Sequence, residues 1–195
     1  CFIMSVSLQA QEHFADRYNV SYITMDDGLP HNFIDDIYKD TRGFLWISTA
    51  GGGLSRYDGY EFIHFNPNTP HSKLKSNFIH NVYEDRFHRL WIVSEGGTDI
   101  IDLSTLQSVI PNDPKGLLPR FINHPTYIVI LDSQGCIWLQ CDNALHRITF
   151  DAEGGIDTLS TLDLPEQDEP DLILKDIDED GKIWTGINGT IYKIT

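Results

Sequence analysis

This sequence of 195 residues has little positive charge. Its 14 lysines and arginines stand against 29 aspartates and glutamates, so the formal net charge is −15. Recognition of nucleic acid needs a basic surface that meets the phosphates, and no cluster of Lys or Arg is present. Nucleic acid is therefore excluded as a partner of this chain, whereas the acidity itself indicates only that the chain is soluble.

Cysteine is also scarce, with three residues. Cys136 and Cys141 flank one expected strand at an odd separation, so their side chains should point to opposite faces of a sheet. We expect no disulfide between them, no zinc site, and two semi-buried free thiols.

The motifs of common catalytic and metal sites are missing as well. The eight histidines show no His-Glu-x-x-His spacing, and no Gly-x-Ser-x-Gly elbow is present. Residues 176–181 match the start of a calcium loop, but Ile187 stands where that loop needs a bidentate Glu. We therefore assign no catalytic residue, no metal ligand and no cofactor to this chain.

What the sequence does contain is an internal repeat centred on tryptophan. Each of the four tryptophans has an Asp six residues before it, and consecutive tryptophans are 45, 47 and 46 residues apart. Three copies also have Gly three residues before the Trp, and His88 replaces it in the second copy. The shared Asp and Trp positions are Asp40 and Trp46, Asp85 and Trp91, Asp132 and Trp138, and Asp178 and Trp184.

Each copy contains short runs of β-branched and aromatic residues bounded by Gly, Asn and Asp, which indicates about four strands per repeat. A period near 46 residues with four short strands is typical of a β-propeller blade. The sequence therefore predicts an all-β chain of four-stranded antiparallel blades, at about residues 32–65, 77–110, 125–162 and 171–194. The connectors between them, 66–76, 111–124 and 163–170, are rich in Pro and polar residues and are expected to be loops.

The residues before the first blade divide into two parts. Residues 1–10 are apolar and uncharged, too short to span a bilayer, and typical of the end of a secretory signal peptide cleaved after Ala10. Residues 11–24 form a lead that ends in a lone strand over 18–24, with the blade region spanning 25–195. That strand could complete the last blade, which lacks a fourth strand, or belong to another blade.

The repeat predicts a structural role for its Trp and Asp residues. A blade buries its faces only against neighbouring blades, and a large flat Trp suits that interface. In the Asp-x-x-Gly segment, Asp can accept backbone hydrogen bonds and Gly can adopt the positive φ of a tight turn.

Blade topology also predicts where a ligand would bind. If the strands run from inner to outer and alternate in direction, the blade connectors and the turns after each Trp strand share one face. Solvated turns are the alternative role for each residue there. The candidate ligand-binding residues are Asn32, Asn77, Glu95, His124, Asp142, Asn143 and Asn188.

Blade one carries a family resemblance. Residues 27–34 read Asp-Gly-Leu-Pro-His-Asn-Phe-Ile, and residues 37–49 read Ile-Tyr-Lys-Asp-Thr-Arg-Gly-Phe-Leu-Trp-Ile-Ser-Thr. Residues 52–59 continue with Gly-Gly-Leu-Ser-Arg-Tyr-Asp-Gly. This phrase resembles the two-component regulator propeller repeat, and later copies keep mainly the Asp, the Trp and the strand pattern.

The resemblance implies the periplasmic sensor region of a hybrid two-component histidine kinase of the Bacteroidetes type. It implies an oligosaccharide ligand, further blades beyond this piece, a membrane anchor outside this chain, and signalling through a phosphorelay to transcription. An open piece would expose strand edges, so association into a homodimer is an expected assembly. Two alternatives stay open, namely a secreted propeller enzyme that cleaves glycans and a scaffold that binds proteins.

Overall fold

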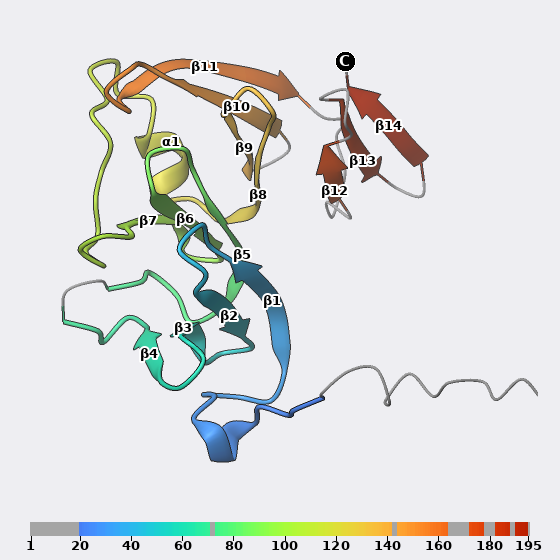
Figure 1. Cartoon of the computed structure of the whole chain (residues 1–195). Helices are drawn as coiled ribbons and strands as arrows, with labels where there is room; N and C mark the ends of the chain where they lie inside the picture. Colours follow the sequence, from blue (N-terminus) through green and yellow to red (C-terminus); the bar gives the residue numbers. More distant parts are fainter. Residues whose placement is uncertain are drawn as a thin grey trace, which may run out of the picture.

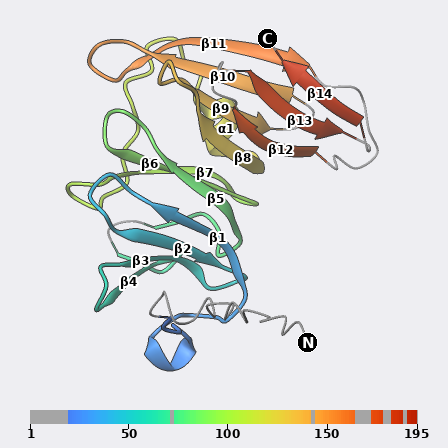
Figure 2. The same cartoon turned by 45° about the vertical axis from the view of Figure 1, so that its right-hand side comes forward.

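The computed structural model describes residues 20–70, 73–141, 144–163, 172–177, 182–187 and 190–194. Within these residues, antiparallel strands form four sheets that follow one another along an arc in chain order (Figures 1 and 2). Each sheet pairs strands that are neighbours in sequence, so every sheet is a meander of hairpins. The predicted all-β fold of antiparallel propeller blades is confirmed, and two of the four sheets have the expected four strands within the described residues.

The strand bounds are as follows. Blade one contains β1 (Ile34–Lys39), β2 (Leu45–Thr49), β3 (Gly53–Tyr57) and β4 (Phe62–Phe65). Blade two contains β5 (Ile79–Glu84), β6 (Arg89–Ser94) and β7 (Gly97–Asp102). Blade three contains β8 (Thr126–Leu131), β9 (Ile137–Cys141), β10 (Ala144–Phe150) and β11 (Ile156–Asp163), and blade four contains β12 (Leu172–Ile177), β13 (Ile183–Ile187) and β14 (Thr190–Ile194).

The first strand of each blade lies on the inner side of the arc, and β5 contacts both β1 and β8. Side-chain hydrogen bonds join these inner strands. The Asp36 carboxylate accepts from the Val82 N–H at 3.2 Å. One blade further, the Asn81 amide donates to the Val129 carbonyl and accepts from the Val129 N–H, both at 3.0 Å. The inner strands of blades one, two and three are thus bonded in succession although no sheet continues across the gap.

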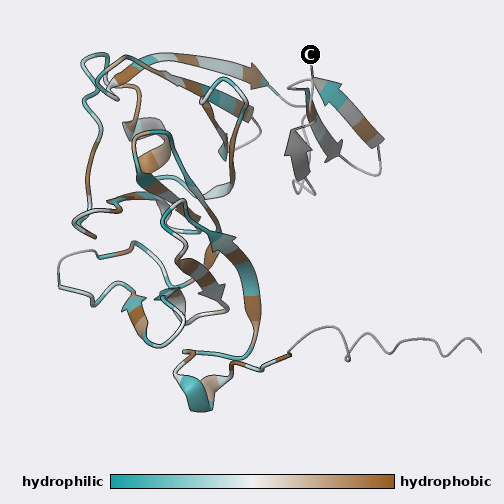
Figure 3. Ribbon diagram, in the orientation of Figure 1, coloured by the Kyte–Doolittle hydropathy of each residue, from teal (hydrophilic) through white to brown (hydrophobic). Residues whose placement is uncertain are grey.

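The hydrophobic core lies between blades. Trp46 of blade one packs in a cluster with Ile79, Leu90 and Ile92 of blade two. Trp91 of blade two packs in a second cluster with Val129, Leu139 and Ile148 of blade three. Apolar and polar segments alternate along the strands (Figure 3). The core is therefore the sum of blade-to-blade contacts, as the repeat predicts.

The repeated Asp and Trp contact each other directly. The indole N–H donates to the Asp carboxylate six residues earlier in three blades, at 2.9 Å for Trp46 and Asp40, 2.8 Å for Trp91 and Asp85, and 3.0 Å for Trp138 and Asp132. Each carboxylate also accepts two backbone N–H groups of its own turn. The aspartate therefore fixes the hairpin and the orientation of the indole together. Asp178 of the fourth repeat lies outside the described residues.

The turn geometry explains the glycine of the repeat and its replacement. Gly43 and Gly135 have φ of 93° and 76°, and His88 has φ of 58° at the equivalent position of blade two. A non-Gly residue in this region is uncommon because its Cβ crowds the backbone. His88 is held there with its Nδ1 2.8 Å from Glu84 Oε1.

The tryptophans differ in burial along the arc. Trp46 and Trp91 are 0% exposed, Trp138 is half-buried, and Trp184 is 37% exposed. The Lys193 ammonium lies 4.8 Å from the centroid of the Trp184 ring. The following blade covers the indoles of Trp46 and Trp91. Their burial therefore depends on residues outside their own repeat.

Three expectations about secondary structure are wrong. Residues 20–24 are not a strand, whereas the sequence predicted one over 18–24, because no described segment pairs with them. The expected fourth strand of blade two, 106–110, is reduced to one bridge between Ile101 and Ser108. Leu106 with φ of 58° turns the chain there, and Pro111 cannot donate to a ladder. The connector 111–124 contains a one-turn helix, α1 (Pro119–Ile122), that starts at a proline.

Replacement of Asp85 by Ala should destabilise the fold strongly. Asp85 is buried and accepts from Trp91 Nε1 and, at 2.7 Å, from Arg89 Nε, whose side chain is 8% exposed. Removing one partner of a buried ion pair leaves the other charge without compensation, which costs about 3–5 kcal/mol. Urea unfolding of the two proteins measures the difference. The control is Asp58→Ala, which removes a carboxylate that caps an exposed turn. Its urea midpoint should stay close to that of wild type. Equal effects of the two substitutions would contradict the stabilising role of Asp85.

Asn81→Ala should loosen the inner strands. It removes a donor and an acceptor, and it leaves the Val129 N–H and carbonyl without that partner. We expect a loss of about 1–3 kcal/mol in the free energy of unfolding. Asn68→Ala, at an exposed loop residue, is the control in the same urea titration, and a loss no larger than the control's would refute the bridging role.

Candidate functional site

A cavity opens between blades one and two, where the inner strands begin. Its volume is about 300 Å³, and its lining residues are Asp35, Ala50, Phe78, Ile79, His80 and Glu95. Asp35, Phe78, Ile79 and His80 come from β1, β5 and the residue before β5, whereas Ala50 and Glu95 follow the Trp strands β2 and β6. This is the end of the blades where strand topology predicts a ligand face.

Three inner strands carry a β-bulge at the same place in the repeat. The pairing register shifts between Ile34 and Asp36 in β1, between Ile79 and Asn81 in β5, and between Thr126 and Ile128 in β8. The extra residues are therefore Asp35, His80 and Tyr127, each 11 positions before its Trp. We call these three residues the bulge triad.

A bulge bends the strand and re-aims the extra side chain, and bulges are frequent beside functional sites. Here Asp35 and His80 line the cavity, and the Tyr127 ring lies beside His80 with ring centroids 5.3 Å apart. The sequence alone does not single out these residues. The position 11 before the Trp is Asp, His and Tyr in turn, but the next position also varies, as Asp36, Asn81 and Ile128.

His80 has a distinctive electrostatic environment. Burial lowers the pKa of its imidazole below the usual 6.5, while the nearby carboxylates of Glu95 and Asp35 oppose that shift. Its Nε2 is buried and makes no hydrogen bond to any residue that the structure describes. A buried ring nitrogen without a partner is available to a hydroxyl or other donor of a ligand.

The aromatic side chain of Phe78 lines the cavity, and that of Tyr127 lies beside His80. Phe78 is 52% exposed and Tyr127 is 38% exposed, although large aromatic residues usually bury most of their area. Phe33, at the position of blade one equivalent to Phe78, is 63% exposed. The site thus combines exposed ring faces with two carboxylates and an imidazole.

The candidate ligand-binding residues that were predicted from the sequence do not all lie at this cavity. Glu95 lines the cavity. Asn32 is exposed, and its Oδ1 accepts from the Met25 N–H at 3.1 Å. Asn77 precedes Phe78, and its side-chain Oδ1 is buried without a hydrogen-bond partner among the described residues. His124 is exposed on the connector into blade three, and Asp142, Asn143 and Asn188 lie outside the described residues.

Asn77 lies close to Gly53, the first residue of β3, and His124 lies close to Gly97, the first residue of β7. In both cases the contact is with the third strand of the preceding blade. The Asn77 carbonyl accepts from the Gly53 N–H at 3.1 Å. Gly97 begins β7 with φ of 115°, and a Cβ on it would lie 2.3 Å from the Ile122 carbonyl oxygen and 3.2 Å from that of His124. The backbones approach so closely that only glycine fits there. This contact fixes the connector and therefore the entry into the next inner strand.

Other site classes are not supported by the described residues. Within the part of the chain that the structure describes, no three His, Cys, Asp or Glu side chains are grouped so as to hold a metal ion. Of the calcium-loop match at 176–181, residues 178–181 lie outside that part. Cys136 and Cys141 are buried and are not joined by a disulfide, and Arg147 Nη2 donates to Cys136 Sγ at 3.0 Å. Over the described residues, no helix has the length and apolarity of a membrane span.

Successive antiparallel blades around an inner row of strands, with cores between blades, define the protein as a β-propeller. The comparisons agree with that class. Residues 28–51 and 73–96 match the family described as two component regulator propeller, so these two segments are repeats of that type. A search of curated proteins found no match.

Solved structures share the fold. Two extracellular domains of hybrid two-component systems from B. thetaiotaomicron superpose with TM-scores of 0.59 and 0.58, at 24% and 19% identity. They cover 86% and 90% of this chain, which spans 23% and 30% of theirs. Virginiamycin B lyase from Staphylococcus aureus superposes with a TM-score of 0.56 at 15% identity, over 83% of this chain and 55% of the lyase. At these identities the likeness establishes the propeller fold.

The depressed pKa of His80 predicts a pH dependence of stability. In the unfolded chain His80 takes up a proton near pH 6.5, whereas the folded chain takes it up only at lower pH. The unfolded state then binds more protons, so stability falls as pH drops below about 6.5. Wild type should lose more stability than His80→Gln between about pH 7.5 and about pH 5.5. Urea titrations at both pH values test this, with His124→Gln at an exposed histidine as control; equal losses for wild type and His80→Gln would disprove it.

Proposed function

We propose that this chain is part of the extracytoplasmic, ligand-sensing propeller of a hybrid two-component sensor kinase, and that its ligand is an oligosaccharide. The observation that carries the proposal is the bulge triad, which presents Asp35, His80 and Tyr127 beside one cavity on the ligand-facing end of the blades. The two repeats of the two-component regulator type support the sensor assignment.

The chemistry of the site suits a sugar. Carboxylates of Asp35 and Glu95 can accept charge-assisted hydrogen bonds from hydroxyl groups, and His80 Nε2 is an acceptor when the ring is protonated on Nδ1. The exposed faces of Phe78 and Tyr127 can pack against the apolar C–H face of a pyranose ring. A concave site with a few convergent polar groups and aromatic walls is the usual form of a small-ligand site.

Signalling would follow from differential binding. A ligand that contacts two blades, or two subunits, binds best to one relative placement of them and shifts the population toward it. The kinase that reads this change would lie outside this chain, on the far side of the membrane, with the propeller in the periplasm. The resemblance between this chain and extracellular domains of hybrid two-component systems supports that arrangement.

An enzyme is the second candidate. The cavity gathers four titratable groups, Asp35, His80, Glu95 and the neighbouring Tyr127, which are the residue types of general acid–base chemistry. Virginiamycin B lyase has the same fold, so a propeller of this kind is compatible with an enzyme. Incubating the purified chain with oligosaccharides and looking for cleaved or unsaturated products distinguishes this candidate from a sensor.

Calorimetric titration with a panel of neutral and acidic oligosaccharides tests the proposal. Tyr127→Ala and Asp35→Asn should each weaken binding of the best oligosaccharide by about tenfold or more, because a stacked ring or a charge-assisted hydrogen bond is worth about 1–3 kcal/mol. Tyr60→Ala is the matched control, since Tyr60 is 91% exposed in the turn before β4 and should leave affinity unchanged.

The outcomes separate the candidate functions. Binding that depends on the bulge triad without product formation supports the sensor. Product formation that His80→Gln abolishes supports the enzyme. Binding that is equally tight in Tyr127→Ala, Asp35→Asn and Tyr60→Ala would place the ligand site elsewhere.

A further inference from the structure

The cavity between blades one and two is lined by carboxylates that have no matching cation. Asp35 belongs to β1, and Glu95 belongs to the turn after β6. Among the described residues, neither carboxylate accepts a hydrogen bond or forms an ion pair, and no Lys or Arg lines the cavity. The protein therefore supplies negative charge here from two blades and leaves it uncompensated.

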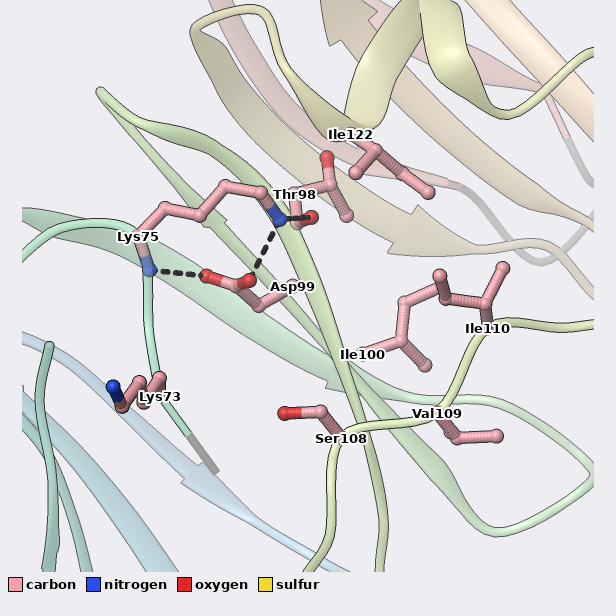
Figure 4. A pocket seen from close by; sticks show the side chains of 9 residues that line it. All are labelled: Lys73, Lys75, Thr98, Asp99, Ile100, Ser108, Val109, Ile110 and Ile122. Atoms are coloured by element: carbon pink, nitrogen blue, oxygen red, sulfur yellow. Dashed lines mark hydrogen bonds and ion pairs between the residues drawn. The ribbon is translucent and has the colours of Figure 1, made fainter. Parts of the chain in front are cut away.

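A second cavity, of about 240 Å³ beside β7, shows the opposite arrangement (Figure 4). There the Lys75 ammonium lies 2.7 Å from Asp99 Oδ1, so the protein itself neutralises that carboxylate. The Lys75 backbone passes close to Gly96, directly after Glu95, because a Cβ on Gly96 would lie 3.1 Å from the Lys75 carbonyl oxygen. The cation nearest in the chain to Glu95 is thus bound at the other cavity.

The imidazole of His80 does not provide the missing positive charge at neutral pH. Burial lowers the pKa of this ring below 6.5, and the carboxylates of Glu95 and Asp35 oppose that shift. Near neutral pH the ring is therefore mainly uncharged, and a neutral imidazole has one acceptor nitrogen. The polar groups of the cavity are mostly acceptors, which suit a ligand that brings N–H donors and positive charge.

The wall and the size of the cavity set further conditions on the ligand. Phe78 lines the cavity and is 52% exposed, and the face of an aromatic ring attracts a cation through its quadrupole. The cavity volume of about 300 Å³ is at the lower end of the range of about 300–1,000 Å³ that is usual for small-ligand sites. One sugar ring with its substituents fits such a space, and the rest of an oligosaccharide would extend outside it.

We propose that the sugar bound at this cavity is an amino sugar with a free, protonated amine, and that the site discriminates against acidic sugars. The ammonium group would pair with the carboxylates of Asp35 and Glu95, and the sugar ring would pack against Phe78. Opposite charges favour the correct ligand, and like charges brought together disfavour the wrong one. This inference rests on the proposed function, because it names the class of sugar for the same site.

Calorimetric titration at about pH 7 with four β-1,4-linked disaccharides tests the inference. The probes are the glucosamine disaccharide, its N,N′-diacetyl derivative, cellobiose and cellobiouronic acid. They share one linkage, and they are cationic, neutral, neutral and anionic in that order. The glucosamine disaccharide should bind at least about tenfold more tightly than either neutral probe, and cellobiouronic acid should bind most weakly.

Charge variants at the cavity locate the effect. Asp35→Asn and Glu95→Gln keep the side-chain size, and each should reduce the preference for the glucosamine disaccharide over cellobiose to about threefold or less. Glu95→Lys should reverse the order, so that cellobiouronic acid binds more tightly than the glucosamine disaccharide. The matched control is Glu61→Gln, which removes one charge at an exposed glutamate before β4 and should leave all affinities unchanged.

Three results would overturn the inference. Equal affinity for the cationic and neutral probes, or tighter binding of the acid, removes the charge preference and leaves the sensor proposal standing. Equal losses in Glu61→Gln and Glu95→Gln would show that the net charge of the whole chain attracts the probe. Absence of binding by all four probes up to about 10 mM also overturns it, and the broader oligosaccharide panel then decides the proposed function separately. Circular dichroism establishes that each variant folds.

Discussion

The hydrogen bond from the indole to the aspartate six residues earlier, made by Trp46, Trp91 and Trp138, is the interaction on which this structure depends. It links two features that are usually separate, the hairpin turn and the packing face of the blade. The carboxylate closes the turn by accepting backbone N–H groups, and with its second oxygen it holds the indole flat against the next blade. Because the core of a propeller lies between blades, the orientation of one ring decides how well two blades fit.

Because the blades are so similar, the positions at which they depart from the repeat are informative. The inner strands of blades one, two and three carry a bulge at one shared place, and the extra residue there is Asp35, His80 and Tyr127 in turn. Within the described residues, blades two and four have three paired strands each, and in blade two a cavity lies beside the third strand. A scaffold built from nearly equal units can vary a few positions without loss of packing, since those positions do not contribute to the interblade core. The bulge triad is a departure of this kind.

Much of the fold was predictable from the sequence because its signals are local. The Asp-to-Trp spacing and the turn glycines predict hairpins, and the period predicts blades. The failures have equally physical causes. The lead over 20–24 alternates like a strand but has no described partner, and the segment 106–110 is diverted by the left-handed turn at Leu106. Of the candidate site residues, Glu95 lines the cavity, whereas the bulge triad was missed because a bulge is defined by pairing with another strand.

The sequence by itself determined the unit of this protein: a hairpin-forming repeat with one buried ring per copy, in an acidic chain without a basic surface. These properties follow from residues within a few positions of one another. Only the tertiary structure decided which side chains leave the regular pattern and meet. Asp35, His80 and Tyr127 are far apart in sequence, and they converge because neighbouring inner strands lie side by side and each is bulged at the same level. Convergence of this kind depends on strand register and on the fit between blades, neither of which a single repeat encodes.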